Sequence, residues 1–173
     1  MGMLLLGRYP LMNRFGAILA RSIGTVAVGA AFTVFCLPGV SWATLGGSSG
    51  SIDSDQTQMQ GTRRTIAGNL YTIHEITAAT GTVVREFVSL DGTVFAVAWQ
   101  GPRVPDLRQL LGSYFEPYAQ AAQMQGGARA GRRPMTVNQT GLVVQAGGRI
   151  RAFTGRAYVP QMLPAGVKLE EIQ

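Results

Sequence analysis

The chain has 173 residues, and its 15 lysines and arginines against nine acidic residues give a formal net charge of +6. With one histidine and one cysteine, it can build neither a closed zinc site of four cysteines, or of two cysteines and two histidines, nor a catalytic zinc site of three histidines. It also lacks a phosphate-binding glycine loop with its lysine and a dinucleotide fingerprint, so the sequence predicts no cofactor and no metal.

The first 43 residues predict an export signal. Residues 1–22 contain three arginines and no acidic residue, and the apolar stretch at residues 23–37 is shorter than the roughly 20 residues that a membrane-spanning helix needs. Ser41-Trp42-Ala43 then places small residues three positions and one position before a cleavage point. We therefore expect a signal peptide at 1–43 and a periplasmic or extracellular location, with an uncleaved N-terminal anchor as the alternative.

Removal of the leader changes the chemistry of the mature chain, whether translation starts at Met1, Met3 or Met12. It takes away Cys36, the only cysteine, so no internal disulfide and no thiolate site remain. Phe35 stands where lipidation of Cys36 would require a small residue. The net charge falls from +6 to +3, because the leader takes away three arginines and no acidic residue. Only weak attraction to anionic partners is therefore expected, and no nucleic-acid partner. Residues 44–173 have the length of one domain, with no stable membrane span after cleavage.

The N-terminal half of the mature chain predicts one helix and three strands. Residues 44–51 are rich in glycine and serine and predict a flexible linker, and residues 52–60 predict a short helix whose N-terminal end suits Asp53 and Asp55. Asp91-Gly92 is the strongest hairpin signal in the chain. Runs of β-branched and aromatic residues predict strands at residues 70–77, 82–90 and 93–100.

The C-terminal half predicts a helix, a loop and a hairpin. Apolar residues recur with helical spacing from Leu107 to Tyr118, and Pro117 must kink this helix or end its first segment. A glycine-rich loop follows at residues 125–134. Residues 135–146 and 149–159 predict two strands turning at Gly147-Gly148, with Gly155 as a bulge.

The order and spacing of these elements predict the fold class. Short turns within each group of strands imply antiparallel pairing. We expect an α+β domain with an antiparallel sheet of about five strands, made of a three-strand meander and a C-terminal hairpin, and with helices packed on one face.

Charged residues predict the register of the first hairpin. A two-residue turn at residues 80–81 would place Glu75 opposite Glu86, and like charges facing across a ladder are destabilising. A three-residue loop at residues 79–81, with Gly81 in the left-handed conformation, instead pairs Glu75 with Arg85 and His74 with Glu86. Continued through the next turn, this register places Val84 beside Trp99, Glu86 beside Val97 and Val88 beside Phe95.

Several segments, taken in their order and spacing, resemble a known family. They are Tyr71-Thr72-Ile73-His74-Glu75-Ile76, Gly81-Thr82-Val83-Val84-Arg85-Glu86-Phe87-Val88, residues 94–102, residues 105–115, Gly141-Leu142-Val143-Val144 and Leu163-Pro164-Ala165-Gly166-Val167. The set resembles the uncharacterised exported bacterial family catalogued as domain of unknown function 2844, over nearly all of the mature chain. The resemblance implies a similar exported single-domain protein and supplies no established activity, ligand or catalytic residue.

Two groups of polar residues are candidate sites. His74 is the only conventional base for a serine nucleophile, and with Glu86, Glu75 and Arg85 nearby it could transfer protons; a structural polar network is the simpler interpretation. The second candidate is the glycine-rich loop, which could bind anionic polymers or phospholipid head groups, although a solvated loop is again simpler. Its arginines are Arg129, Arg132 and Arg133.

Aromatic residues offer a third feature, which could form a shelf for a ligand. Their helical and strand spacing makes them core residues instead. They are Trp99, Tyr114, Phe115 and Tyr118.

Three functions are compatible with this sequence. The first is a non-enzymatic accessory protein that contacts another envelope or secreted protein, for which we expect an exposed apolar patch or an unpaired sheet edge. The second is a binder of anionic envelope material through the arginine loop. The third is a small hydrolase or isomerase using His74 and Glu86, which requires that the pair open into a pocket. We favour the first, because the domain is small and has few groups capable of catalysis.

Overall fold

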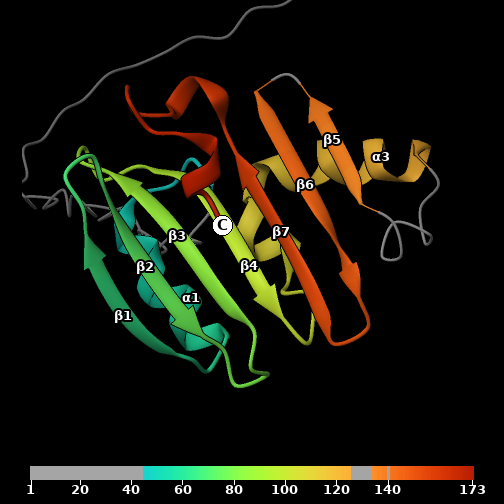
Figure 1. The fold of residues 1–173 in the computed structure, drawn as a ribbon, viewed down its shortest axis with the longest axis horizontal. Helices are drawn as coiled ribbons and strands as arrows, with labels where there is room; N and C mark the ends of the chain where they lie inside the picture. Colours follow the sequence, from blue (N-terminus) through green and yellow to red (C-terminus); the bar gives the residue numbers. More distant parts are fainter. Residues whose placement is uncertain (1–44, 126–133, 140) are drawn as a thin grey trace, which may run out of the picture. The chain divides into compact units, whose positions relative to one another are not determined.

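The computed structural model describes residues 45–125, 134–139 and 141–173. These residues form one antiparallel sheet of seven strands in the order β1-β2-β3-β4-β7-β6-β5 (Figure 1). The predicted α+β class is confirmed, but the sheet has seven strands rather than about five. The strands are β1 (Thr62–Ala67), β2 (Tyr71–Thr77), β3 (Val83–Ser89), β4 (Val94–Gly101), β5 (Met135–Gln139), β6 (Leu142–Arg149) and β7 (Ala152–Tyr158).

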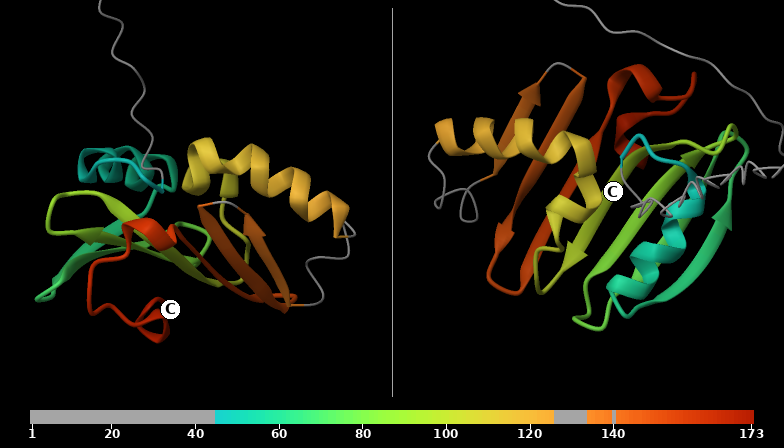
Figure 2. Two further views of the ribbon diagram at one scale, coloured as in Figure 1. Left: turned by 90° about the horizontal axis from the view of Figure 1, so that it is seen from above. Right: turned by 180° about the vertical axis from the view of Figure 1, so that it is seen from behind.

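Three α-helices cover one face of the sheet, as predicted (Figure 2). They are α1 (Ile52–Gln58), α2 (Leu107–Leu111) and α3 (Phe115–Met124). Ile52, Leu110, Leu111 and Tyr118 pack from these helices against the sheet. The strand residues of this core include Ile76, Val84, Val97, Trp99, Val144 and Ala157.

The two additional strands have separate causes. All six residues of β1 are exposed, so the sequence has no apolar alternation to mark it, and β1 forms by pairing with β2. The predicted long strand at residues 135–146 is divided into β5 and β6, which pair as a hairpin with Gln139 opposite Leu142. Gly141 has a φ of 85°, a left-handed conformation that glycine adopts at little cost.

The last hairpin turns later than the sequence predicted. Gly147 and Gly148 lie inside β6, opposite Thr154 and Phe153, and the chain turns after Arg149, which pairs with Ala152. Arg151 takes the left-handed conformation in this turn, with a φ of 66°. The Gly-Gly signal therefore does not mark a turn.

Gly155 is not a bulge but a packing site for Trp99. It lies in regular register between Trp99 of β4 and Ala146 of β6. A Cβ atom at this position would clash with the Trp99 ring, so the glycine makes room for the indole. The irregularity in the sheet is between Phe87 and Val88.

That irregularity changes one predicted pair. Val84 lies opposite Trp99 and Glu86 opposite Val97, as predicted, but Val88 lies opposite Val94 rather than Phe95. Phe95 packs instead with Phe87 on the other face of the sheet.

The predicted helix over residues 107–118 is interrupted before Pro117. After α2, Gly112 has a φ of 50° and begins a short 3-10 turn that ends at Tyr114. Pro117 then stands in the first turn of α3, where a missing backbone donor costs no hydrogen bond. The break thus comes from the glycine and not from the proline.

The predicted flexible linker is ordered where it is described. Leu45 is buried, and the backbone nitrogen of Gly46 donates to the Val94 oxygen at 2.8 Å. Ser48 forms a β-bridge with Thr93. Glycine and serine content alone did not reveal these contacts, which join the start of the domain to β4.

The second face of the sheet is covered in part by residues 160–173 (Figure 2). Ile172 is fully buried against Phe87 and Phe95, with Leu163 and Leu169 packed nearby. No pattern in residues 160–173 predicted that this segment packs against the sheet. No helix in the described part of the chain is both long and apolar enough to cross a membrane.

Candidate functional site

The first hairpin has the predicted register. Gly81 has a φ of 81°, and the backbone nitrogen of Ala78 donates to the oxygen of Thr82 across a three-residue loop. His74 lies opposite Glu86, and Glu75 lies opposite Arg85. Because neighbouring residues in a strand point to opposite faces, the two pairs lie on different sides of the sheet.

Glu75 is shared by two arginines on the face that residues 160–173 partly cover. Arg64 Nε and Arg85 Nε each donate to one of its carboxylate oxygens at 2.8 Å. The hydrogen bond from Arg64 lowers the pKa of Glu75. Burial acts in the opposite direction, and the hydrogen bond from Arg85 lowers the pKa further. Arg85 also donates to the backbone oxygen of Gln173 at 2.8 Å.

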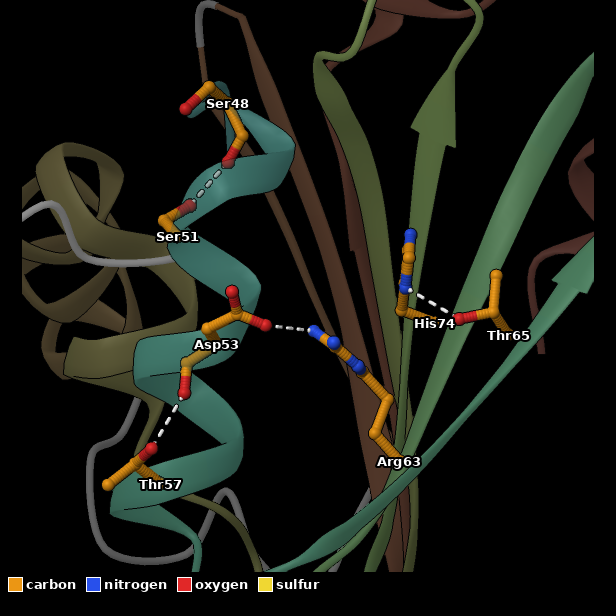
Figure 3. A network of polar contacts seen from close by, with 7 residues as sticks. All are labelled: Ser48, Ser51, Asp53, Thr57, Arg63, Thr65 and His74. Carbon is orange, nitrogen blue, oxygen red and sulfur yellow. Dashed lines mark hydrogen bonds and ion pairs between the residues drawn. The ribbon is translucent and has the colours of Figure 1, made fainter.

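His74 does not bond to Glu86, although the two residues lie side by side. Its Nδ1 is 3.2 Å from the hydroxyl of Thr65 on β1 (Figure 3). Burial and the nearby Arg63 lower the pKa of His74, with Asp53 acting against them. Arg63 itself pairs with Asp53 of α1 at 2.6 Å. The prediction of a shared face is confirmed, but the polar partner of His74 is a hydroxyl.

The partner of Glu86 is Asp55 of α1, which the sequence analysis did not assign to a site. Both residues are fully buried, and their carboxyl groups are close enough to affect each other's ionisation. The side-chain amide of Gln109, from α2, donates to Asp55. Among the described residues, Asp55 Oδ2 and both oxygens of Glu86 lack a hydrogen-bond partner. Two carboxyl groups can satisfy each other in such a place only when one of them carries a proton.

Burial raises the pKa of both acids. The pKa of Asp55 rises to about 6, with the hydrogen bonds from Glu86 and Gln109 limiting the increase. The pKa of Glu86 rises to about 10, because burial and the neighbouring Asp55 both oppose its ionisation. Burial and the closeness of the two acids therefore favour one shared proton on the pair at neutral pH.

A signal for the burial of Asp55 was present in the sequence. Ile52, Asp55 and Met59 stand three and four positions apart, so they share one side of a helical segment. Ile52 is buried and Met59 packs against the same core. Asp53 and Asp55 looked equivalent as acids in the first helical turn, but only Asp53 faces solvent.

The exposed edge of β1 is the second feature. In the described part of the chain, β1 pairs only with β2, which leaves its outer edge without a neighbour. A cavity of about 340 Å³, the edge groove, lies at the turn from β1 to β2 and is lined in part by Ile66, Leu70, Tyr71, Ile73 and Glu171. Ile66 and Leu70 are each 41% exposed, so this end of the strand presents apolar surface to solvent.

The sequence of this chain matches the model of a known protein family. A family model described as "Protein of unknown function (DUF2844)" matches residues 41–172. The chain belongs to this family. Comparisons with curated proteins and with solved structures found no match.

The remaining predicted features of this DUF2844 protein have different outcomes. Trp99 and Tyr118 are buried in the core, as predicted, with Tyr114 and Phe115 packed against it. The arginine loop, with Arg129, Arg132 and Arg133, lies outside the described residues, as does the predicted signal peptide 1–43. Within the described ranges, no three potential metal-ligating side chains come together.

The two polar groups of the DUF2844 fold differ in what they can do. Asp55 and Glu86 have the separated pKa values typical of an acid–base pair, but both are fully buried. Neither these residues nor His74 line any of the three grooves described on the surface. The outer edge of β1, in contrast, has no neighbouring strand among the described residues.

Proposed function

We propose that this protein is an exported accessory protein that binds another envelope or secreted protein through the outer edge of β1. The observation that carries the proposal is the outer edge of β1, which pairs with no other described strand and whose six residues are all exposed. A strand edge presents a row of backbone donors and acceptors, and an extended segment of a partner can pair with them as an additional strand.

Export is supported by the leader. The positively charged start, the short apolar stretch and Ser41-Trp42-Ala43 form the pattern of a cleavable signal peptide. The mature chain would then work in the periplasm or outside the cell, without a cysteine.

A binding role is preferred to catalysis because of where the titratable groups lie. Glu86 and Asp55 are fully buried, and the His74 side chain bonds to Thr65 rather than to Glu86. A hydrolase or isomerase needs its acid and base to reach a substrate. An apolar groove next to an open strand requires no such chemistry and suits a peptide segment.

Site-specific photo-crosslinking in the producing cells tests this proposal. A photoreactive amino acid replaces Ile66 at the β1 edge in one variant and Ile150 in the turn between β6 and β7 in another. Ile150 is a matched control because it is also an exposed isoleucine, with 83% of its surface accessible. We expect an adduct with one extended segment of one exported protein from position 66, identified by mass spectrometry. Absence of this adduct, or the same adduct from position 150, would contradict the proposal.

A further inference from the structure

The two faces of β1 differ in how their charge is balanced. Arg63, on the helix side, has its own carboxylate in Asp53, at 2.6 Å. Arg64, on the opposite side, shares Glu75 with Arg85, so these three side chains carry a net charge of +1. The excess positive charge lies next to the open edge, because Arg64 belongs to the outermost strand.

Arg64 is also the more available of the two arginines that contact Glu75. Its side chain is 67% exposed, against 30% for Arg85. Arg85 has a further partner in the backbone oxygen of Gln173, whereas Arg64 bonds only through Nε among the described residues. A guanidinium has five N–H donors in a planar fork, so Arg64 retains donors for a second carboxylate.

Ile66 stands two residues after Arg64 and on the same face, since Arg64 pairs with Glu75 and Ile66 with Ile73. It lies in the wall of the edge groove with Leu70, Tyr71 and Ile73, where the carboxylate of Glu171 accepts from the Tyr71 hydroxyl. A strand added to β1 would place one side chain beside Arg64 and another beside Ile66, with Cβ atoms about 4.5 to 5.5 Å from theirs. The first position favours an acidic residue and the second an apolar one.

We propose that the outer edge of β1 binds an extended partner segment as an antiparallel strand, and that this segment has an apolar residue followed two positions later by an acidic residue. The inference rests on the proposed function and specifies its partner. The direction follows from the sheet, whose described strands all pair antiparallel. In an antiparallel pair the residue opposite Ile66 precedes the residue opposite Arg64.

The other edge of the sheet does not have these features. The outer strand there is β5, whose five residues include no charged side chain. A requirement for an acidic residue in the partner therefore distinguishes β1 from β5.

The test uses the protein purified as it is exported and a short, threonine-rich fluorescent peptide with Ile-Thr-Glu at its centre. We expect the peptide to bind, and to bind about two- to fivefold more weakly to R64Q, as is typical of an exposed ion pair. A peptide with glutamine in place of glutamate should bind both proteins equally, as should the original peptide at high salt. R149Q is the matched control and should change nothing, because it removes an exposed arginine at the end of β6, which four strands separate from β1.

Hydrogen exchange locates the peptide. Binding should protect backbone amides of β1, and a peptide of reversed order, Glu-Thr-Ile, should bind more weakly. Equal affinity of the wild-type protein and R64Q for the glutamate peptide, or protection at β5 instead, would overturn the inference. If position 66 crosslinks to a natural partner while Arg64 has no effect on the peptide, only this inference fails. If binding of the peptide depends on Arg64 but no natural partner crosslinks at position 66, the proposed function fails.

Discussion

At the scale of single residues, the pair of buried carboxyl groups is the feature that depends most on its environment. Asp55, Glu86 and Gln109 come from α1, β3 and α2 and meet beneath the helices. Hydrogen bonding within this group offsets part of the cost of burying it. Removing one member would leave a buried polar group or charge without a partner.

The titration of Glu86 should appear in the pH dependence of stability. A carboxyl pKa raised by folding means that the folded state binds more protons than the unfolded state above the unfolded pKa. Stability is therefore greatest below that value and falls as the pH rises towards about 10. The slope is at most about 1.4 kcal/mol per pH unit for one proton. We expect Glu86→Gln to remove this decrease above neutral pH, because the amide has nearly the size and shape of the carboxyl group and does not titrate.

Urea unfolding at a series of pH values measures this effect. The Asp55 carboxyl remains titratable in the variant. The decrease in stability as the pH rises from 3.8 to about 6 should therefore persist. Glu116→Gln is the matched control, since Glu116 is an exposed acid paired with Arg108, and it should follow the wild-type curve. Parallel curves for wild type and Glu86→Gln above neutral pH would show that Glu86 does not hold the proton.

The residue scale also shows what a sequence can predict about a site. The avoidance of like charges across a ladder was enough to predict that His74 lies opposite Glu86. Strand register says nothing about which residue a helix brings onto the sheet, so Asp55 was missed. The helical spacing of Ile52, Asp55 and Met59 indicated that Asp55 is buried. Using this signal would have meant treating an acidic residue as part of the core.

At the scale of elements, the predictions succeeded where apolar alternation was present. The strands β2, β3 and β4 were predicted with small errors at their ends. β1 was missed because it lacks a buried face, and the end of β6 was misplaced because glycines suggested a turn inside a strand. In both regions, pairing with a neighbouring strand decides the structure, and local sequence preference does not show it.

The segment at residues 160–173 is an element that the sequence analysis overlooked, and its contribution should be measurable. Ile172 is fully buried on the second face of the sheet. Replacing a buried isoleucine with alanine costs about 2 to 5 kcal/mol, through lost burial and the cavity that remains. We expect Ile172→Ala to lower the free energy of unfolding by an amount in this range, measured with urea. Gln173→Ala, a change at the neighbouring exposed side chain, should have little effect; equal stability of both variants would show that Ile172 does not contribute to the core.

At the scale of the whole molecule, the proposed export can be tested independently of any partner. The predicted cleavage after Ala43 gives a mature protein that begins at Thr44. Signal processing requires a small residue immediately before the cut, so Ala43→Arg should leave the leader attached. Trp42→Leu changes the position between the two small residues and should be processed normally. Intact mass measurement of the exported and cell-associated protein decides this, and processing of both variants at the same residue would contradict the predicted site.

The order of strands has a further consequence, which concerns how the sheet is assembled. β1 to β4 form one meander and β5 to β7 another, and in each of them every strand pairs with its neighbour in the chain. Within the described sheet, the two meanders pair with each other where β4 meets β7, at the place where the Trp99 ring lies against Gly155. Contacts between chain neighbours form quickly, whereas contacts between distant residues carry the entropic cost of closing a longer loop. During synthesis from the N-terminus, β4 thus remains an unpaired edge until residues 152–158 have been added, and the molecule exposes a hydrophobic strand that the finished fold encloses.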